Sequence, residues 1–104
     1  MIFIETPIFT KVITQLIPDD EYGQLQRELL LAPDTGVLIK GAGGLRKIRW
    51  KAKGSGKRAG IRVIYYLDLP DIFYMVFAFK KTDQEDLTSD QRKVLKELVQ
   101  EWLS

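Results

Sequence analysis

The residues best suited to chemistry in this chain are cations with a regular spacing. Residues 40–62 contain nine basic side chains and no acidic one, whereas the rest of the chain carries a formal charge of −7. Within this segment Lys47, Arg49, Lys51 and Lys53 occupy every second position. In a strand that spacing puts them on one face about 7 Å apart, in a row that matches the phosphates of a nucleic acid. The segment therefore predicts a nucleic-acid-binding face, with a solvated charged hairpin as the alternative.

Arg62 is the basic residue in the least expected context. It stands near the beginning of the otherwise apolar segment 61–67, where burial of an unpaired charge would be costly. Two explanations are open. A carboxylate such as Asp68 or Glu5 pairs with Arg62 for structural reasons, or its planar guanidinium faces a phosphate at the open face of a sheet.

The segment that follows the last apolar run contains both cations and carboxylates. Lys80 and Lys81 end the run, and either protect a sheet edge or belong to the basic surface. The carboxylates after them show no metal-binding spacing, and we expect them to solvate a turn and to favour the start of the final helix. These carboxylates are Asp83, Glu85 and Asp86.

Several classes of site are excluded by composition. The chain has no cysteine and no histidine, so disulfides, Cys/His zinc sites, thiol nucleophiles and imidazole catalysis are ruled out. The glycine-rich loop 54–60 is not a Walker A motif. We therefore expect no metal and no cofactor. Apolar runs stay far below the ~18 to 20 residues of a membrane span, which predicts a cytoplasmic protein without a membrane partner.

The elements that hold these residues change from a helical to a strand period. Residues 1–5 predict a strand, and Thr6-Pro7 begins the first of two helices, which Pro18 separates and Pro33 ends. From residue 45 the period becomes two, typical of strands. The predicted strands are 45–53, 61–68 and 72–79.

A capping box of Thr88 and Gln91 predicts a final helix. The element order is thus β-αα-βββ-α. It indicates one α+β domain, residues 1–104, with an antiparallel sheet and all helices packed on one of its faces.

Three segments taken together resemble a family of bacterial toxins. They are the glycine and basic run 43–49, the segment 53–66 that contains Arg62, and Lys81 with residues 86–91. The chain is similar to the RelE/HigB family of type II toxins, and most similar to its HigB-like branch. The resemblance implies a RelE-like fold and a metal-independent endoribonuclease, an mRNA interferase that acts in the ribosomal A site, cleaves translated mRNA and inhibits translation. It also implies a cognate antitoxin, a small helix-turn-helix protein, through which alone the toxin reaches operator DNA.

Carried over by position, the resemblance implies two groups of site residues. The implied catalytic residues are Lys47, Arg49, Arg62 and Lys81. The implied RNA- and ribosome-binding residues are Arg46, Lys51, Lys53, Lys57, Arg58 and Lys80. The chain departs from many relatives around Lys81, which follows Lys80 and precedes Thr82-Asp83, and it has no tyrosine or histidine after Tyr74. The general base of those relatives is therefore not transferable.

The residues themselves suggest a mechanism for RNA cleavage. Cleavage needs a general base that takes the proton of the 2′-OH and a general acid that protonates the departing 5′-oxygen. It also needs positive charge that stabilises the extra negative charge around the five-coordinate phosphorus. A lysine crowded by other cations, Lys47 or Lys81, suits the base, while the planar guanidinium groups of Arg49 and Arg62 suit the phosphate. Two alternatives are a basic nucleic-acid-binding module without chemistry and an inactive toxin relative that acts as co-repressor with its antitoxin.

Overall fold

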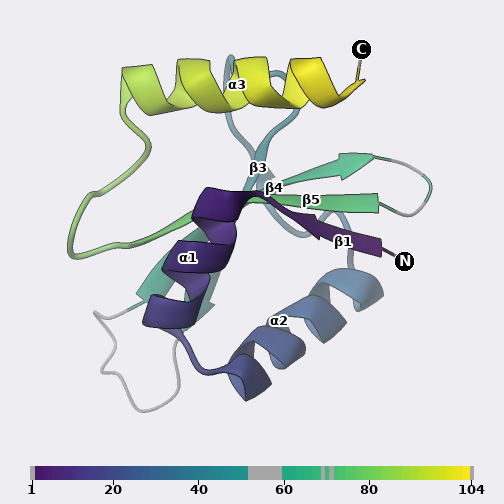
Figure 1. Ribbon diagram of the computed structural model, residues 1–104, viewed down its shortest axis with the longest axis vertical. Helices are drawn as coiled ribbons and strands as arrows, with labels where there is room; N and C mark the ends of the chain where they lie inside the picture. The colour runs from purple at the N-terminus through teal and green to yellow at the C-terminus, as the bar shows by residue number, and fades with distance from the viewer. Residues whose placement is uncertain (1, 52–59, 69, 71, 104) are drawn as a thin grey trace.

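Figure 1 shows the computed structural model, which describes residues 2–51, 60–68, 70 and 72–103. The α+β class predicted from the sequence is confirmed, and the described residues form three helices and one five-stranded sheet. No described helix has the length and hydropathy needed to cross a membrane. In chain order the elements are β1 (Ile2–Glu5), α1 (Pro7–Leu16), α2 (Asp19–Leu31), β2 (Val37–Leu38), β3 (Arg46–Lys51), β4 (Gly60–Asp68), β5 (Ile72–Lys80) and α3 (Ser89–Leu103).

The sheet is mixed, so the prediction of a wholly antiparallel sheet is wrong. Its strand order is β1-β5-β4-β3-β2, and β1 pairs with β5 in parallel while the other pairs are antiparallel. A hairpin forces antiparallel pairing, but residues 6–71 separate β1 from β5, which is ample for the crossover that parallel strands need. The two-residue strand β2 was not predicted, because it is too short for a recognisable alternation.

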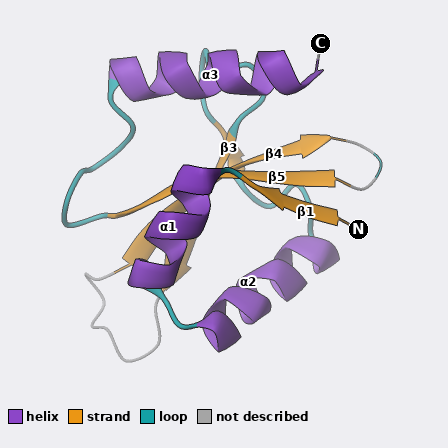
Figure 2. Ribbon diagram, in the orientation of Figure 1, coloured by secondary structure: helices purple, strands orange, loops and turns teal. Residues whose placement is uncertain are grey.

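The helices cover both faces of the sheet, which corrects the prediction that they pack on one face. α3 lies on one side, and α1 and α2 lie on the other (Figure 2). The reason is that β4 and β5 are apolar on both faces, and each face must be removed from water. Under α1 and α2 the buried residues include Phe9, Leu25, Val63, Tyr65 and Phe73, and under α3 they include Ile64, Val76, Phe79, Leu95 and Val99.

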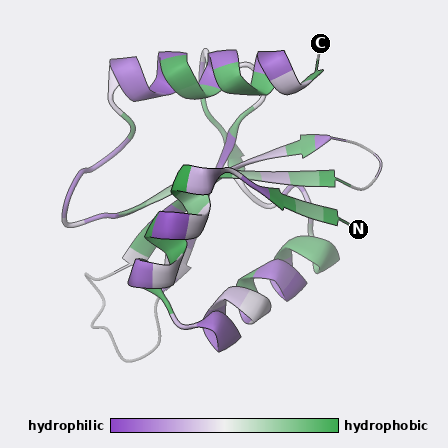
Figure 3. Cartoon of the chain, viewed as in Figure 1, coloured by the Kyte–Doolittle hydropathy of each residue, from purple (hydrophilic) through white to green (hydrophobic). Residues whose placement is uncertain are grey.

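The strands and the helices differ in how hydropathy varies along their length. Figure 3 shows hydrophobic residues dominating β1 and β5, whereas α3 alternates between hydrophobic and hydrophilic residues. This is the pattern of helices that bury one stripe and expose the other. The predicted caps of α1 and α3 are confirmed, whereas α2 begins after Pro18 without a side-chain cap. Thr6 Oγ1 accepts the Phe9 N–H at 2.9 Å at the start of α1, and Gln91 N donates to Thr88 Oγ1 at 3.0 Å at the start of α3.

A bulge interrupts the pairing of β4 with β5. Ile64 pairs with Phe77, whereas the next residue, Tyr65, pairs with Met75, so Val76 is an extra residue of β5. Thr6 holds this bulge, because its hydroxyl donates to Val76 O at 2.8 Å and its backbone N–H donates to Met75 O at 3.0 Å. The end of β1 is therefore fastened to the middle of β5.

Candidate functional site

Pairing of β3 with β4 puts the predicted row of cations on the α3 side of the sheet. Directly paired residues share a face, and Lys47 is paired with Ile64, which is buried under α3. Arg49 and Lys51 continue the same face, whereas the alternating Ile48 and Trp50 pack against the core under α1 and α2. Lys53, the last member of the predicted row, lies outside the described residues.

Arg62 is buried in this face, and none of the described carboxylates forms an ion pair with it. Its side chain is 7% exposed, and it lies directly opposite Arg49 on β3. Like charges in that position repel each other. The hydrogen bond from Arg62 Nη1 to Ile61 O is long, at 3.4 Å. Burial and the charge of Arg49 lower the pKa of Arg62, against the opposing influence of Asp86.

The structural explanation for Arg62, an ion pair with Glu5 or Asp68, is not observed among the described residues. Glu5 accepts hydrogen bonds from Thr10 Oγ1 and from the Tyr22 hydroxyl. Asp68 lies at the opposite end of β4, paired with Ile72. No described carboxylate forms an ion pair with Arg62, so its charge is available to a ligand.

A hollow of about 160 Å³ opens where three strands end together. Lys81 N donates to Gly60 O at 3.1 Å, and Gly60 is paired with Lys51, so cations from β3 and from the end of β5 flank a glycine. A Cβ at Gly60 would lie in ordinary van der Waals contact, 3.4 Å from Trp50 O and 3.5 Å from Arg62 Nη1. The residues that line the hollow are Arg49, Trp50, Lys51, Gly60, Arg62 and Lys81.

Lys80 and Arg46 are placed differently from the residues of the hollow. Lys80 pairs with Ile61, which belongs to the core under α1 and α2, and it does not line the hollow. Arg46 Nη1 donates to Asp34 O at 3.2 Å and to Gly36 O at 2.8 Å, so it supports the segment before β2. The remaining predicted contacts, Lys57 and Arg58, lie outside the described residues.

A second hollow borders the same row of cations on its β2 side. It measures about 470 Å³, and Arg49 lines both hollows. It is lined by Thr35 and the apolar residues Val37 and Ile48, together with Lys47 and Arg49. The basic face therefore offers a small cationic hollow and, beside it, a larger and less polar one.

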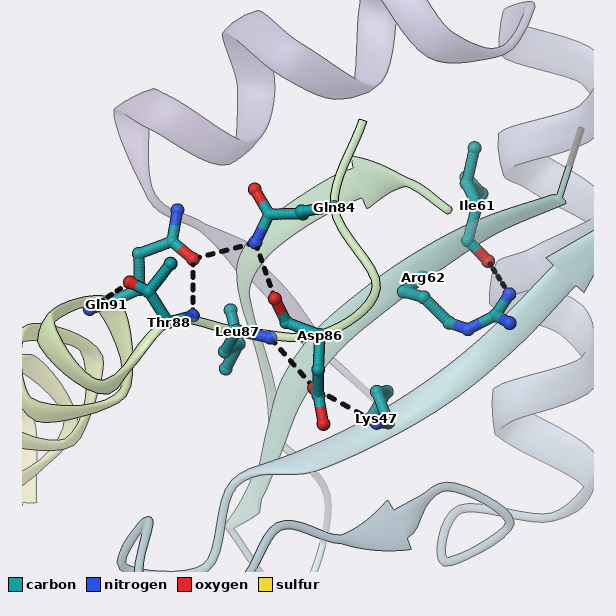
Figure 4. A network of polar contacts seen from close by, with 8 residues as sticks. All are labelled: Lys47, Ile61, Arg62, Gln84, Asp86, Leu87, Thr88 and Gln91. Atoms are coloured by element: carbon teal, nitrogen blue, oxygen red, sulfur yellow. Dashed lines mark hydrogen bonds and ion pairs between the residues drawn. The ribbon is translucent and has the colours of Figure 1, made fainter. Parts of the chain in front are cut away.

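One carboxylate enters the basic face, and the sequence did not identify it. Asp86 Oδ1 lies 3.1 Å from Lys47 Nζ (Figure 4), and the same oxygen accepts the Leu87 N–H at 2.8 Å. Partial burial raises the pKa of Asp86, but the Leu87 hydrogen bond and the charges of Lys47 and Arg92 outweigh it and leave the pKa below its usual value. In the sequence Asp86 looks like its neighbours Asp83 and Glu85, because only the path of the loop distinguishes them.

The arrangement suits recognition of a phosphodiester. Arg49 and Arg62 are directly paired across β3 and β4 and line the same hollow, and each guanidinium can offer a fork of N–H donors to phosphate oxygens. Lys51 and Lys81 add charge around the same hollow. Donors fixed in this way stabilise negative charge most where it accumulates, as it does on a phosphorus under attack.

Comparison with known protein families supplies an independent identification. Residues 36–104 match the family described as the RelE toxin of the RelE / RelB toxin-antitoxin system. The matched segment runs from the residue before β2 to the end of the chain. It contains Asp86 and every residue that lines the two hollows, apart from Thr35. This confirms the resemblance seen in the sequence at the level of the RelE family. The chain belongs to the RelE family of toxins from toxin-antitoxin systems.

Proposed function

We propose that this protein is a ribosome-dependent endoribonuclease of the HigB-like branch, which cleaves translated mRNA and so inhibits translation. The observation that carries the proposal is Arg62, a buried guanidinium that faces Arg49 and has no carboxylate partner among the described residues. A residue kept for stability would need a counter-ion, because an unpaired buried charge is destabilising. A phosphodiester bound in the hollow supplies that counter-ion.

Bound there, the two non-bridging oxygens of the phosphate face Arg49 and Arg62. Attack of the 2′-oxygen on phosphorus forms the new P–O bond, and the bond to the 5′-oxygen breaks. The products are a 2′,3′-cyclic phosphate and a 5′-hydroxyl. The charge that develops on the five-coordinate phosphorus strengthens both arginine contacts, and such contacts are the ones that accelerate a reaction.

Two lysines move the protons in this proposal. A general base must be neutral and a general acid must be protonated. Lys47 forms an ion pair with Asp86, whereas Lys81, which lines the hollow, forms none with a described carboxylate. We therefore assign Lys81 as the base that takes the 2′-OH proton and Lys47 as the acid that gives a proton to the 5′-oxygen.

The ribosome is required because this site lacks an imidazole and must be given a well-oriented substrate. Orientation of reacting groups can supply ~7 to 11 kcal/mol of the barrier. In the cell this places the protein in the cytoplasm, where mRNA is translated. The β1–α1 segment packs on β5, so the proposed toxin domain extends over residues 1–104 rather than over the matched segment alone.

Membership of a toxin-antitoxin family implies an antitoxin partner. We propose that this antitoxin is a small helix-turn-helix protein encoded beside the toxin, and that the toxin reaches operator DNA only through it. Whether the neighbouring reading frame encodes such a protein is a direct check.

Primer extension on mRNA in a reconstituted translation system tests the proposed activity. We expect discrete breaks within translated codons when ribosomes are programmed with that message, and intact RNA when ribosomes are omitted. Intact message at stoichiometric protein would reject the nuclease. Salt-sensitive binding without cleavage would indicate a nucleic-acid-binding module, and tight antitoxin binding with normal growth on expression would indicate an inactive co-repressor.

A further inference from the structure

The carboxylate of Asp86 is held in place from two directions. Its Oδ1 accepts from the Leu87 N–H at 2.8 Å and lies 3.1 Å from Lys47 Nζ. Its backbone carbonyl accepts from Gln84 Nε2 at 2.9 Å, and the same amide donates to Gln91 Oε1 at 2.8 Å (Figure 4). Gln91 in turn forms the capping box of α3. The start of α3 thus fixes a single negative charge over the basic face.

We propose that Asp86 is a positioning residue, whose carboxylate holds the ammonium of Lys47 in place beside the phosphate-binding hollow. The inference rests on the proposed function for the reaction that Lys47 serves. Lys47 lies two residues before Arg49 on the same face of β3, so its side chain starts about 7 Å from the arginine that lines the hollow. The long side chain of Lys47 can place its ammonium at many positions within that distance. An ion-pair partner restricts the ammonium to one of them.

Stability does not explain this ion pair. The side chain of Lys47 is 26% exposed and that of Asp86 is 46% exposed, and ion pairs in such surroundings contribute little to folding. What the pair does provide is order, because a lysine fixed before the reaction loses less conformational entropy in the transition state. The neighbouring carboxylate Glu85 has no ion pair with a described cation, so it makes a matched control.

Single-turnover cleavage at saturating ribosome tests the proposal with four variants. We expect Asp86→Asn to lower the rate about tenfold or more while ribosome affinity stays within about twofold, because positioning acts on the chemical step. Glu85→Gln removes the same charge from the same loop and should match the parent. Lys47→Gln should also be slow. The double variant Lys47→Gln/Asp86→Asn should be no slower than Lys47→Gln, because Asp86 acts through Lys47.

Two kinetic results would overturn the proposal. One is an Asp86→Asn rate equal to that of the parent. The other is an equal loss from Asp86→Asn with and without Lys47, which would mean that Asp86 acts by itself. Thermal unfolding of each variant separates these results from misfolding.

A spectroscopic readout keeps the proposal testable if the parent protein cleaves nothing, which would reject the nuclease but not the ion pair. The ¹⁵Nζ resonance of Lys47 should move in Asp86→Asn and stay in place in Glu85→Gln. If neither substitution changes the chemical shift of Lys47 Nζ, Asp86 does not hold the ammonium, whatever the activity of the protein.

Discussion

Strand β4 buries two polar side chains, Tyr65 and Arg62, in opposite ways. The hydroxyl of Tyr65 donates to Pro33 O at 2.9 Å and accepts the Gly36 N–H at 2.9 Å. Burial raises the pKa of this phenol, and the hydrogen bond from Gly36 only partly opposes it. Arg62, on the other face, has a 3.4 Å hydrogen bond to a neighbouring carbonyl and faces another arginine.

The difference separates a structural polar group from a functional one. Tyr65 uses both hydrogen-bonding capacities of its hydroxyl within the fold, and it ties the segment before β2 to the sheet. The charge of Arg62 is not paired with any described carboxylate. Since an unsatisfied buried group costs about 1 to 3 kcal/mol, more for a charge, its retention points to a ligand rather than to the core. The predictions below test this contrast.

The largest expected effect is that of Arg62→Ala on cleavage. Loss of a guanidinium that binds the phosphate most strongly in the transition state should lower the single-turnover rate by about 10² to 10³. The unfolding free energy should hardly change, because the substitution removes a buried charge that has no ion-pair partner among the described residues. Near-parental cleavage, or a collapse of the melting temperature, would assign Arg62 to the structure and put the catalytic centre elsewhere.

The next largest effect distinguishes two adjacent lysines. Lys81 lines the hollow and Lys80 does not, so Lys81→Ala should slow cleavage about a hundredfold, as expected for loss of a general base. Lys80→Ala is the matched control and should affect mainly the salt dependence of ribosome binding. The reverse ranking in a single-turnover assay would show that the hollow is not the reaction centre.

Tyr65→Phe should show the complementary behaviour to Arg62→Ala. Removing the hydroxyl leaves Gly36 N and Pro33 O without their partner, and should lower the unfolding free energy by about 1 to 3 kcal/mol. Urea unfolding measures this. Cleavage below the melting transition should stay close to that of the parent, and a large loss of rate in the folded variant would contradict the division of roles.

The smallest effect concerns the dependence of stability on pH. Because the pKa of Asp86 is lower in the folded chain than in the unfolded one, its contribution is present above the unfolded pKa and is lost as the pH falls through the folded value. Asp86→Asn should therefore flatten slightly the acid limb of a plot of melting temperature against pH. An unchanged limb would mean that the ion pair with Lys47 does not persist in solution.

The sequence predicted those features that depend on neighbouring residues. Thr6, Thr88 and Gln91 act on N–H groups within three positions, so the starts of α1 and α3 followed from the local pattern. The alternation of Lys47, Arg49 and Lys51 gave the basic face for the same reason, since strand geometry alone decides it.

Features set by distant contacts were missed or wrongly predicted. The parallel pairing of β1 with β5 and the covering of both faces depend on how the whole chain closes, which no local pattern contains. The ion pair of Asp86 with Lys47 joins residues 39 positions apart through a loop whose path depends on Gln84. Arg62 was recognised as unusual, but its lack of a described counter-ion could be established only from the packed structure.

The bulge at Val76 determines on which face of the sheet each residue after it lies. Phe73, Met75 and Ala78 face the α1 and α2 side, so the alternation of β5 changes phase at the extra residue. In an uninterrupted strand Lys81 would fall on the same face as Met75, and Lys80 would take the face of Arg62. One inserted residue, fastened by Thr6, therefore selects which of two chemically identical side chains reaches the hollow. Deleting one residue between the bulge and Lys80 should exchange the two lysines, whereas deleting Val76 should remove the bulge and leave Lys81 at the hollow.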